Sequence, residues 1–257
     1  LPMYVNAALN YRNVSPGQYP SAGPLPHLMD IWRAAAPAID ILSPDFYNPF
    51  FKHYNDLYTR RNNPLFIPEI RLEPSDAAKV FYAIGHYQAI GFSPFSIESA
   101  PDPKMEPVGK SYSILAQLSA EIGKYQGSGR MDGVLLDTQT RKQEIISGDY
   151  KLSIAHDYTL GWSPEVSNSN WPMAGAIIIR EGDNDFIIAG TGIVITFSIN
   201  GTETERAGIL QAEEGKYVNG IWKPGRRMNG DQDHQGRHIR IPAGEWNIQK
   251  VSLYRYK

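Results

Sequence analysis

The sequence predicts a protein of two parts, an α/β domain followed by an all-β domain. Residues 1–126 alternate short apolar runs with segments of helical spacing, whereas residues 127–257 consist of strand patterns joined by tight turns. The chain has 257 residues, of which 42% are hydrophobic and 20% charged, so it can bury a sizeable core. We expect the boundary within "KYQGSGR", residues 124–130.

The first part contains four strand–helix units in sequence. We expect strands over residues 2–9, 38–44, 65–69 and 91–98, and helices over residues 25–37, 50–62, 74–90 and 108–126. Ser75 is the expected N-cap of the third helix, with Asp76 in its first turn. Short continuous apolar runs are typical of parallel strands that are covered on both faces. Four such units form either a small open sheet or half of a (β/α)₈ barrel, whose eight units take about 250 residues.

The second part has the turn signals of an antiparallel β-sandwich or jelly roll. Gly182–Asp185, Gly190–Gly192, Asn200–Gly201 and Glu214–Gly215 punctuate its apolar runs. Such regular spacing of short strands and turns predicts two packed sheets.

Composition argues against several classes of partner. The net charge is −2 and no basic stripe is present, which argues against nucleic acid as a partner. No apolar run approaches the ~20 residues of a membrane span, so we expect no membrane partner. Cysteine is absent, which excludes disulfides and thiolate sites but leaves the compartment open. Because the first residues already form a strand pattern, we expect the chain to begin in the middle of a fold.

One carboxylate ends the strand pattern of "PLFIPEIR", residues 64–71. Glu69 follows an apolar run, and in (β/α)₈ enzymes the chemistry lies at the C-terminal ends of the strands. The alternative is a solvated glutamate, or one paired with Arg71. Pro64 and Pro68 argue against a plain central strand and favour a strand that ends in a sharp turn.

Other polar residues at the strand ends have two interpretations each. Asn6 is a ligand for a sugar hydroxyl or a turn former, and Tyr47 is a site residue or a core tyrosine. For Asp45 we favour a helix N-cap over a sugar ligand. Glu98 is a hydroxyl-binding group or a solvated carboxylate. Glu73 is a competing nucleophile to Glu69 or, as we favour, a residue in the first turn of the next helix.

The long loop over residues 10–26 follows the first strand, and loops of this length are usually functional. Tyr11, together with Tyr19 and His27, either lines a substrate subsite there or is structural.

Two clusters in the second part have a structural and a functional interpretation. "NGDQDHQGRH", residues 229–238, is a polar hairpin loop or, less favourably, a metal site built on Asp231, Asp233, His234 and His238. Four tryptophans form core packing or, less favourably, a sugar platform; they are Trp162, Trp171, Trp222 and Trp246.

Three segments carry a resemblance to a known family. "AIDILSPDFY" (38–47), "PLFIPEIR" (64–71) and "AIGFSPFSIE" (89–98) resemble the second half of the catalytic barrel of family 35 glycoside hydrolases, which are retaining β-galactosidases. The resemblance extends over essentially the whole chain, because one subgroup carries a β-sandwich after its barrel. It implies that the four strands are barrel strands 5–8, with a half barrel over residues 1–126 and a sandwich over residues 127–257.

The resemblance implies a double-displacement mechanism with Glu69 as the nucleophile. Tyr47 would hydrogen-bond that nucleophile, and Asn6, Tyr11 and Glu98 would contribute to substrate binding, without a metal or cofactor. The second catalytic carboxyl group, the acid/base, lies about 5–5.5 Å from the nucleophile in retaining enzymes. In the family it comes from an Asn-Glu pair on strand 4, and this sequence has no Asn-Glu pair.

We therefore expect the N-terminal half of the barrel as a physical partner and a β-galactoside or related glycan as substrate. A periplasmic or secreted location would suit such glycans. The alternative is a non-catalytic carbohydrate-binding or assembly module.

Overall fold

The computed structural model describes residues 1–9, 15, 17–18 and 21–257. The chain forms two compact units. The parallel-sheet unit comprises Leu1–Glu73 and Tyr87–Pro101, and the sandwich unit comprises Pro74–His86 and Asp102–Lys257. The predicted combination of an α/β part and an antiparallel β part is confirmed.

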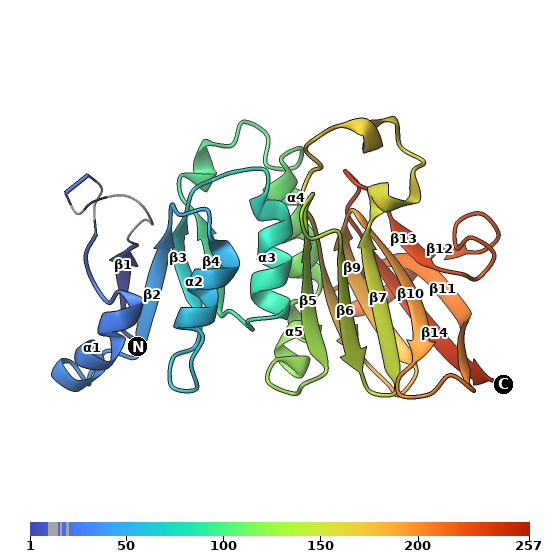
Figure 1. The fold of residues 1–257 in the computed structure, drawn as a ribbon, viewed down its shortest axis with the longest axis horizontal. Helices are drawn as coiled ribbons and strands as arrows, with labels where there is room; N and C mark the ends of the chain where they lie inside the picture. The colour runs from blue at the N-terminus through green and yellow to red at the C-terminus, as the bar shows by residue number, and fades with distance from the viewer. Residues whose placement is uncertain (10–14, 16, 19–20) are drawn as a thin grey trace. The chain divides into compact units, whose positions relative to one another are not determined.

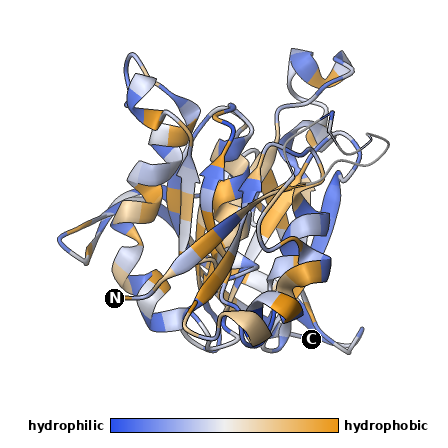
Figure 2. Ribbon diagram, turned by 90° about the vertical axis from the view of Figure 1, so that its left-hand side faces the viewer, coloured by the Kyte–Doolittle hydropathy of each residue, from blue (hydrophilic) through white to orange (hydrophobic). Residues whose placement is uncertain are grey.

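The parallel-sheet unit contains four strands in the order of the sequence. Its elements are β1 (Tyr4–Ala8), η1 (Pro26–Leu28), α1 (Met29–Ala35), β2 (Ile41–Phe46), α2 (Phe51–Tyr58), β3 (Phe66–Ile70), β4 (Gly91–Pro94) and η2 (Ile97–Ser99). Neighbouring strands are parallel throughout, in the order β1-β2-β3-β4 (Figure 1). The apolar runs that predicted these strands are buried, among them Leu42, Leu65 and Ile67. Figure 2 shows hydrophobic residues on the strands and on parts of the helices.

Proline does not end the third strand, contrary to the expectation from "PLFIPEIR". Pro68 lies inside β3, which continues to Ile70 between β2 and β4. Proline has no N–H to donate, and the β3–β4 ladder shifts register between Ile67 and Ile70, where Pro68 stands. Glu69 is therefore a residue within the strand, next to its last.

The sandwich unit consists of two antiparallel sheets and three helices. Its helices are α3 (Asp76–Gly85), α4 (Pro107–Gln117) and α5 (Ser119–Tyr125), with two short 3₁₀ turns, η3 (Asp157–Leu160) and η4 (Pro164–Ser167). Its strands are β5 (Met131–Leu136), β6 (Lys142–Ser147), β7 (Tyr150–His156), β8 (Ala174–Arg180), β9 (Asp185–Thr191), β10 (Ile193–Ile199), β11 (Arg206–Val218), β12 (Ile221–Met228), β13 (Ile239–Ile241) and β14 (Asn247–Tyr256). The sheet orders are β13-β10-β7-β6 and β12-β11-β14-β9-β8-β5.

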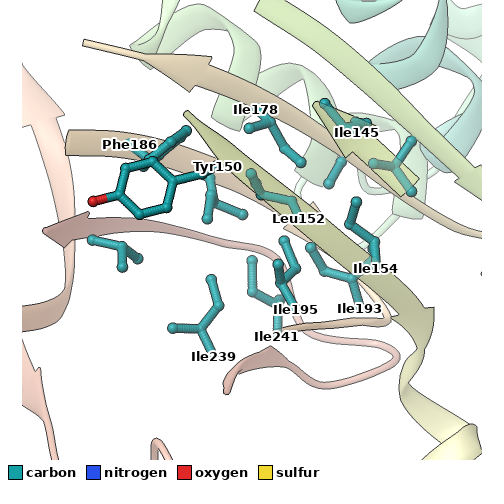
Figure 3. Close-up of a cluster of buried hydrophobic side chains, with 14 of the residues drawn as sticks. Ile145, Tyr150, Leu152, Ile154, Ile178, Phe186, Ile193, Ile195, Ile239 and Ile241 are labelled. Carbon is teal, nitrogen blue, oxygen red and sulfur yellow. The ribbon is translucent and has the colours of Figure 1, made fainter. Parts of the chain in front are cut away.

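The main core lies between the two sheets. Figure 3 shows Leu152, Ile195 and Ile241 of the smaller sheet with Ile178 and Phe186 of the larger one. Fully burying a side chain of this size contributes about 1.5–3 kcal/mol, so this cluster dominates the stability of the unit.

A second core covers the other face of the larger sheet. Phe81 of α3 and Leu118, which joins α4 to α5, pack with Ile177 and Ile179 of β8. The strand β8 is therefore buried on both faces, because Ile178 points into the first core and its neighbours into the second. This explains its unbroken apolar run, since a strand with one solvated face would alternate.

Glycines let α3 approach the larger sheet closely. A Cβ atom at Gly175 would lie 2.5 Å from the backbone oxygen of Ala78, and one at Gly133 would lie 2.8 Å from the backbone nitrogen of His86. The third predicted helix is thus packed within the sandwich unit. The boundary expected between residues 126 and 127 separates helical from strand-rich sequence, whereas the compact units divide the chain at residues 73/74, 86/87 and 101/102.

Helix starts agree with the sequence in part. Ser75 occupies the N-cap position of α3 and Asp76 lies in the first turn, as predicted, although the Ser75 side chain makes no capping hydrogen bond. Glu73 was expected in that first turn but precedes the helix and is exposed.

Candidate functional site

Three neighbouring strands of the parallel sheet bring polar side chains together near their carboxyl ends. In the ladder, Asp45 of β2 pairs with Glu69 of β3, and Ala8 of β1 pairs with Asp45. Paired residues of neighbouring strands point to the same face, as do residues two apart in one strand. Asn6, Asp45 and Glu69 therefore share one face, with their strands about 4.8 Å apart.

Tyr47 holds Glu69. The Tyr47 hydroxyl donates a hydrogen bond to Glu69 Oε1. Burial, followed by this hydrogen bond to Glu69, raises the pKa of Tyr47 to about 12, so the phenol stays protonated and donates at neutral pH. The carboxylate is thereby fixed in orientation while remaining only partly buried.

Arg71 does not pair with Glu69, contrary to one alternative considered for this glutamate. Its guanidinium carbon lies 5.7 Å from the centroid of the Tyr47 ring. Within the described part of the chain, Arg71 and Glu69 form no ion pair. The positive charge thus contacts the ring of Tyr47, whose hydroxyl binds Glu69.

Asp45 is a second, differently placed carboxyl group. Its Oδ2 accepts a hydrogen bond of 2.6 Å from Asn6 Nδ2, whereas its Oδ1 is buried and has no partner among the described residues. Burial raises the pKa of Asp45 to about 6, the Asn6 bond opposes this rise, and the charge of Glu69 adds to it. The site therefore contains a carboxylate held by a phenol beside a carboxyl group whose charge changes in weakly acidic solution.

The expectation that Asp45 caps a helix is wrong. Asp45 lies inside β2, and Phe50 is the N-cap residue of α2. The strand passes through Pro44, whose missing N–H made an earlier end plausible. The side chain that accepts from the Phe50 backbone N–H is that of Asn48, over 2.9 Å.

The described contacts do not bring Glu98 or His27 to this group. Glu98 lies in η2 beyond β4, where it is exposed and makes no hydrogen bond or ion pair with the described residues. Tyr11 and Tyr19 lie outside the described residues. His27 lies in η1 and is exposed.

Sequence inspection missed the pairing of Asp45 with Glu69. The signal available was that both carboxylates stand at the carboxyl ends of consecutive predicted strands. Sequence inspection also missed the contact of Arg71 with the Tyr47 ring. The two residues follow different strands, β2 and β3, so no local pattern indicates that they meet.

The polar loop of the sandwich unit does not resemble a metal centre. The rings of His234 and His238 stack at 5.0 Å, and Asp233 Oδ1 accepts from Gly236 N at 3.1 Å, which closes the loop. Burial, followed by the neighbouring His234, lowers the pKa of His238. Among the described residues, no group of three or more His, Cys, Asp or Glu is arranged to hold a metal ion.

The four tryptophans do not form one platform through any described contact. Trp162 is exposed beside His234 and His238, Trp222 donates to Glu213 Oε1 at 2.7 Å, and Trp246 donates to Ser111 Oγ at 2.9 Å. Trp171 is buried against His156. Trp171, Trp222 and Trp246 are therefore each held by contacts within the sandwich unit, whereas Trp162 is exposed.

Comparison with known families gives a match in the sandwich unit. Residues 108–240 match the model of a family described as "Domain of unknown function (DUF5597)". The chain belongs to this family. The match covers helices α4 and α5 and most strands of the two sheets, and it lies wholly within the sandwich unit. A search of curated proteins returned no match.

The helices of the described chain carry no membrane-spanning segment, since none combines the required length with sufficient apolar character.

Proposed function

We propose that the protein is a retaining glycoside hydrolase acting on β-galactosides, with Glu69 as the nucleophile. The observation that carries the proposal is the arrangement of Glu69, which sits near the carboxyl end of a parallel strand and accepts a hydrogen bond from Tyr47. A nucleophilic carboxylate must be ionised, fixed in direction and accessible to an anomeric carbon.

The chemistry divides among the described side chains as follows. Glu69 would attack the anomeric carbon and form a glycosyl–enzyme bond as the aglycone leaves. Tyr47 would keep the attacking oxygen aligned, because its phenol remains protonated at neutral pH. The Oδ2 of Asp45, which is exposed and held by Asn6, would accept a further hydrogen bond from a hydroxyl of the bound sugar.

The same proposal includes the interpretation of the parallel sheet as half of a (β/α)₈ barrel. Four parallel strands in sequential order, β1-β2-β3-β4, are what strands 5–8 of a (β/α)₈ barrel would provide. Active sites of such barrels lie at the carboxyl ends of the strands, where Asp45 and Glu69 stand.

The acid/base would be a glutamate of the first four barrel strands. The 257 residues contain no Asn-Glu pair that could fill this role in the manner of family 35. Asp45 is bound to Asn6 and adjacent to Glu69 in the same sheet, so we assign it to substrate binding instead.

An activated substrate tests the nucleophile separately from the acid/base. 2,4-Dinitrophenyl β-D-galactopyranoside has a leaving group that departs without protonation, so its release reports attack by Glu69 alone. We expect the protein to release dinitrophenolate in a burst of one equivalent. Glu69→Gln should slow this burst by roughly 10³-fold or more, since the amide is no nucleophile.

Glu73→Gln is the matched control for this experiment. Glu73 lies four residues further along, is exposed, and should tolerate the same substitution with an unchanged burst. A burst equal in the Glu69→Gln and unsubstituted proteins, or none in either, would contradict the proposal. Binding of galactosides without any release would favour the carbohydrate-binding alternative.

A further inference from the structure

A cavity of about 410 Å³ lies at one end of the sandwich. The ends of β7 and β9 and the starts of β8 and β14 meet there, because β8 pairs antiparallel with β9 and β9 with β14. Its walls include Tyr158, Trp171 and Trp246, with Thr191 at the end of β9. Pro74 and Pro107, near the starts of α3 and α4, line it as well. All of these residues belong to the sandwich unit.

Hydrogen bonds behind the walls fix the aromatic rings. Trp246 Nε1 donates to Ser111 Oγ at 2.9 Å, and Ser111 Oγ donates to the Ala77 carbonyl at 2.8 Å. Trp171 Nε1 donates to the Val166 carbonyl at 3.2 Å. These walls are therefore preorganised, so a ligand need not order them on binding.

A neutral histidine, His156, connects two of the wall residues, Tyr158 and Pro172. The backbone N–H of Tyr158 donates to His156 Nδ1 at 3.1 Å, and His156 Nε2 lies 2.8 Å from the carbonyl of Pro172. An N–H can only donate and a carbonyl can only accept, so the imidazole carries its one proton on Nε2. Burial lowers the pKa of His156, which keeps this arrangement in neutral solution.

The lining determines the chemistry of an occupant. Of the twelve described residues that line the cavity, none is a carboxylate, amine, guanidinium or imidazole. The hydroxyl groups of Tyr158 and Thr191 make no hydrogen bond within the described chain, so both can bind a ligand. The volume lies in the range of small-molecule sites. None of the described charged side chains lines the cavity, although Arg141 and Lys110 lie over the rings of Trp171 and Trp246, 4.3 Å and 5.0 Å from the ring centroids. A ligand with apolar faces and hydroxyl groups would match the rings and hydroxyls of the lining together.

We propose that this cavity is a carbohydrate-binding site of the sandwich, which takes one neutral hexopyranose residue of a glycan. The ring faces contact the aromatic walls, and the sugar hydroxyls exchange hydrogen bonds with Tyr158 and Thr191. The site requires no catalysis and is independent of Glu69.

The indole N–H signals of the protein provide a local readout. We would titrate the ¹⁵N-labelled protein with methyl β-D-galactopyranoside and with methyl β-D-glucopyranoside, and follow the five tryptophan signals, assigned by substitution. The signals of Trp171 and Trp246 should shift with saturation, and that of Trp222 should not. Methyl β-D-galactopyranosiduronate, the charged counterpart, should bind more weakly.

Two substitutions remove a hydroxyl group without removing bulk. Tyr158→Phe and Thr191→Val should each weaken binding about 3–10-fold, as expected for one lost hydrogen bond. Tyr254→Phe, at an exposed tyrosine outside the cavity, is the matched control and should leave the affinity unchanged. Because both substitutions are nearly isosteric, the variants should remain folded.

The outcomes separate this proposal from the one for Glu69. Glu69→Gln should leave the titration of Trp171 and Trp246 unchanged. The proposal is overturned if neither neutral sugar shifts these two signals, if both hydroxyl variants bind like the unsubstituted protein, or if the uronate binds as tightly as the neutral sugars. None of these results bears on the dinitrophenolate burst.

Discussion

Two aspartates, one in each unit, show how differently the two units treat a buried charge. In the sandwich, Asp157 accepts two hydrogen bonds from the Arg240 guanidinium and a third, of 3.0 Å, from Ala243 N. In the parallel sheet, Asp45 accepts one bond from Asn6 and keeps a buried oxygen without a partner among the described residues. A carboxylate whose hydrogen bonds are all made stabilises the fold, whereas one that keeps a buried oxygen without a partner, next to a second carboxylate, destabilises the fold.

The comparison predicts the largest stability change at Asp157. Asp157→Ala leaves the Arg240 guanidinium and an amide without their acceptor, which should cost about 3–5 kcal/mol. The free energy of unfolding from urea denaturation, followed by tryptophan fluorescence, measures this, because four of the five tryptophans lie in the sandwich unit.

An exposed ion pair of the same unit is the control. Asp149 pairs with Arg255 at the surface, and Asp149→Ala should change the free energy of unfolding by less than about 1 kcal/mol. Equal losses in the free energy of unfolding for the two variants would contradict the prediction that the buried, hydrogen-bonded aspartate contributes more than the exposed one.

A smaller effect on stability is expected at Tyr47, together with an effect on activity. Tyr47→Phe removes a hydrogen bond to an ionised carboxylate, a loss of about 1.5–3 kcal/mol, so the dinitrophenolate burst should slow about 10–100-fold. The ring and its contact with Arg71 remain, so the free energy of unfolding should fall by less than it does for Asp157→Ala. A stability loss as large as that of Asp157→Ala, with an unaltered burst, would make Tyr47 a structural residue.

The smallest effect is expected at Asp45, and its sign depends on pH. The pKa of Asp45 is raised from 3.8 to about 6, so the folded state binds the proton more tightly than the unfolded state. This contribution to stability is fully present below about pH 4 and is lost as pH rises through 6. Because the carboxyl group is half-exposed, solvent screening reduces the effect to about 1 kcal/mol.

Asp45→Asn should therefore raise stability by about 1 kcal/mol at pH 7.5 and leave it unchanged near pH 4. The ¹⁹F signal of 5-fluorotryptophan at Trp32 would follow urea unfolding of the parallel-sheet unit. A variant less stable than the unsubstituted protein at pH 7.5 would show that ionised Asp45 stabilises the fold, as Asp157 does.

The elements of both units were predictable because their patterns are local. Apolar runs predicted β1–β4, and glycine-containing turns predicted breaks between the sandwich strands. The turn expected at Glu214–Gly215 was wrong, because β11 runs through both residues with a shift in register. Long-range geometry was not predictable. The packing of α3 in the sandwich unit depends on Gly133 and Gly175, which lie far from the helix in sequence and give no local signal. The continuation of β3 through Pro68 depends on a register shift of the neighbouring strand.

The candidate site was predictable to a similar degree. Glu69 and Tyr47 were identified from their positions at strand ends, and the structure joins them by a hydrogen bond. Asp45 was assigned to a helix cap because local propensity favours aspartate there, whereas its place beside Glu69 results from strand register.

The most direct test of the account is the covalent modification of Glu69. The protein would be incubated with 2,4-dinitrophenyl 2-deoxy-2-fluoro-β-D-galactopyranoside, digested, and its peptides sequenced by mass spectrometry. The account predicts one fluorosugar per chain, attached to Glu69 and absent from the Glu69→Gln protein. A label on another residue, or a protein that stays unmodified, would contradict it.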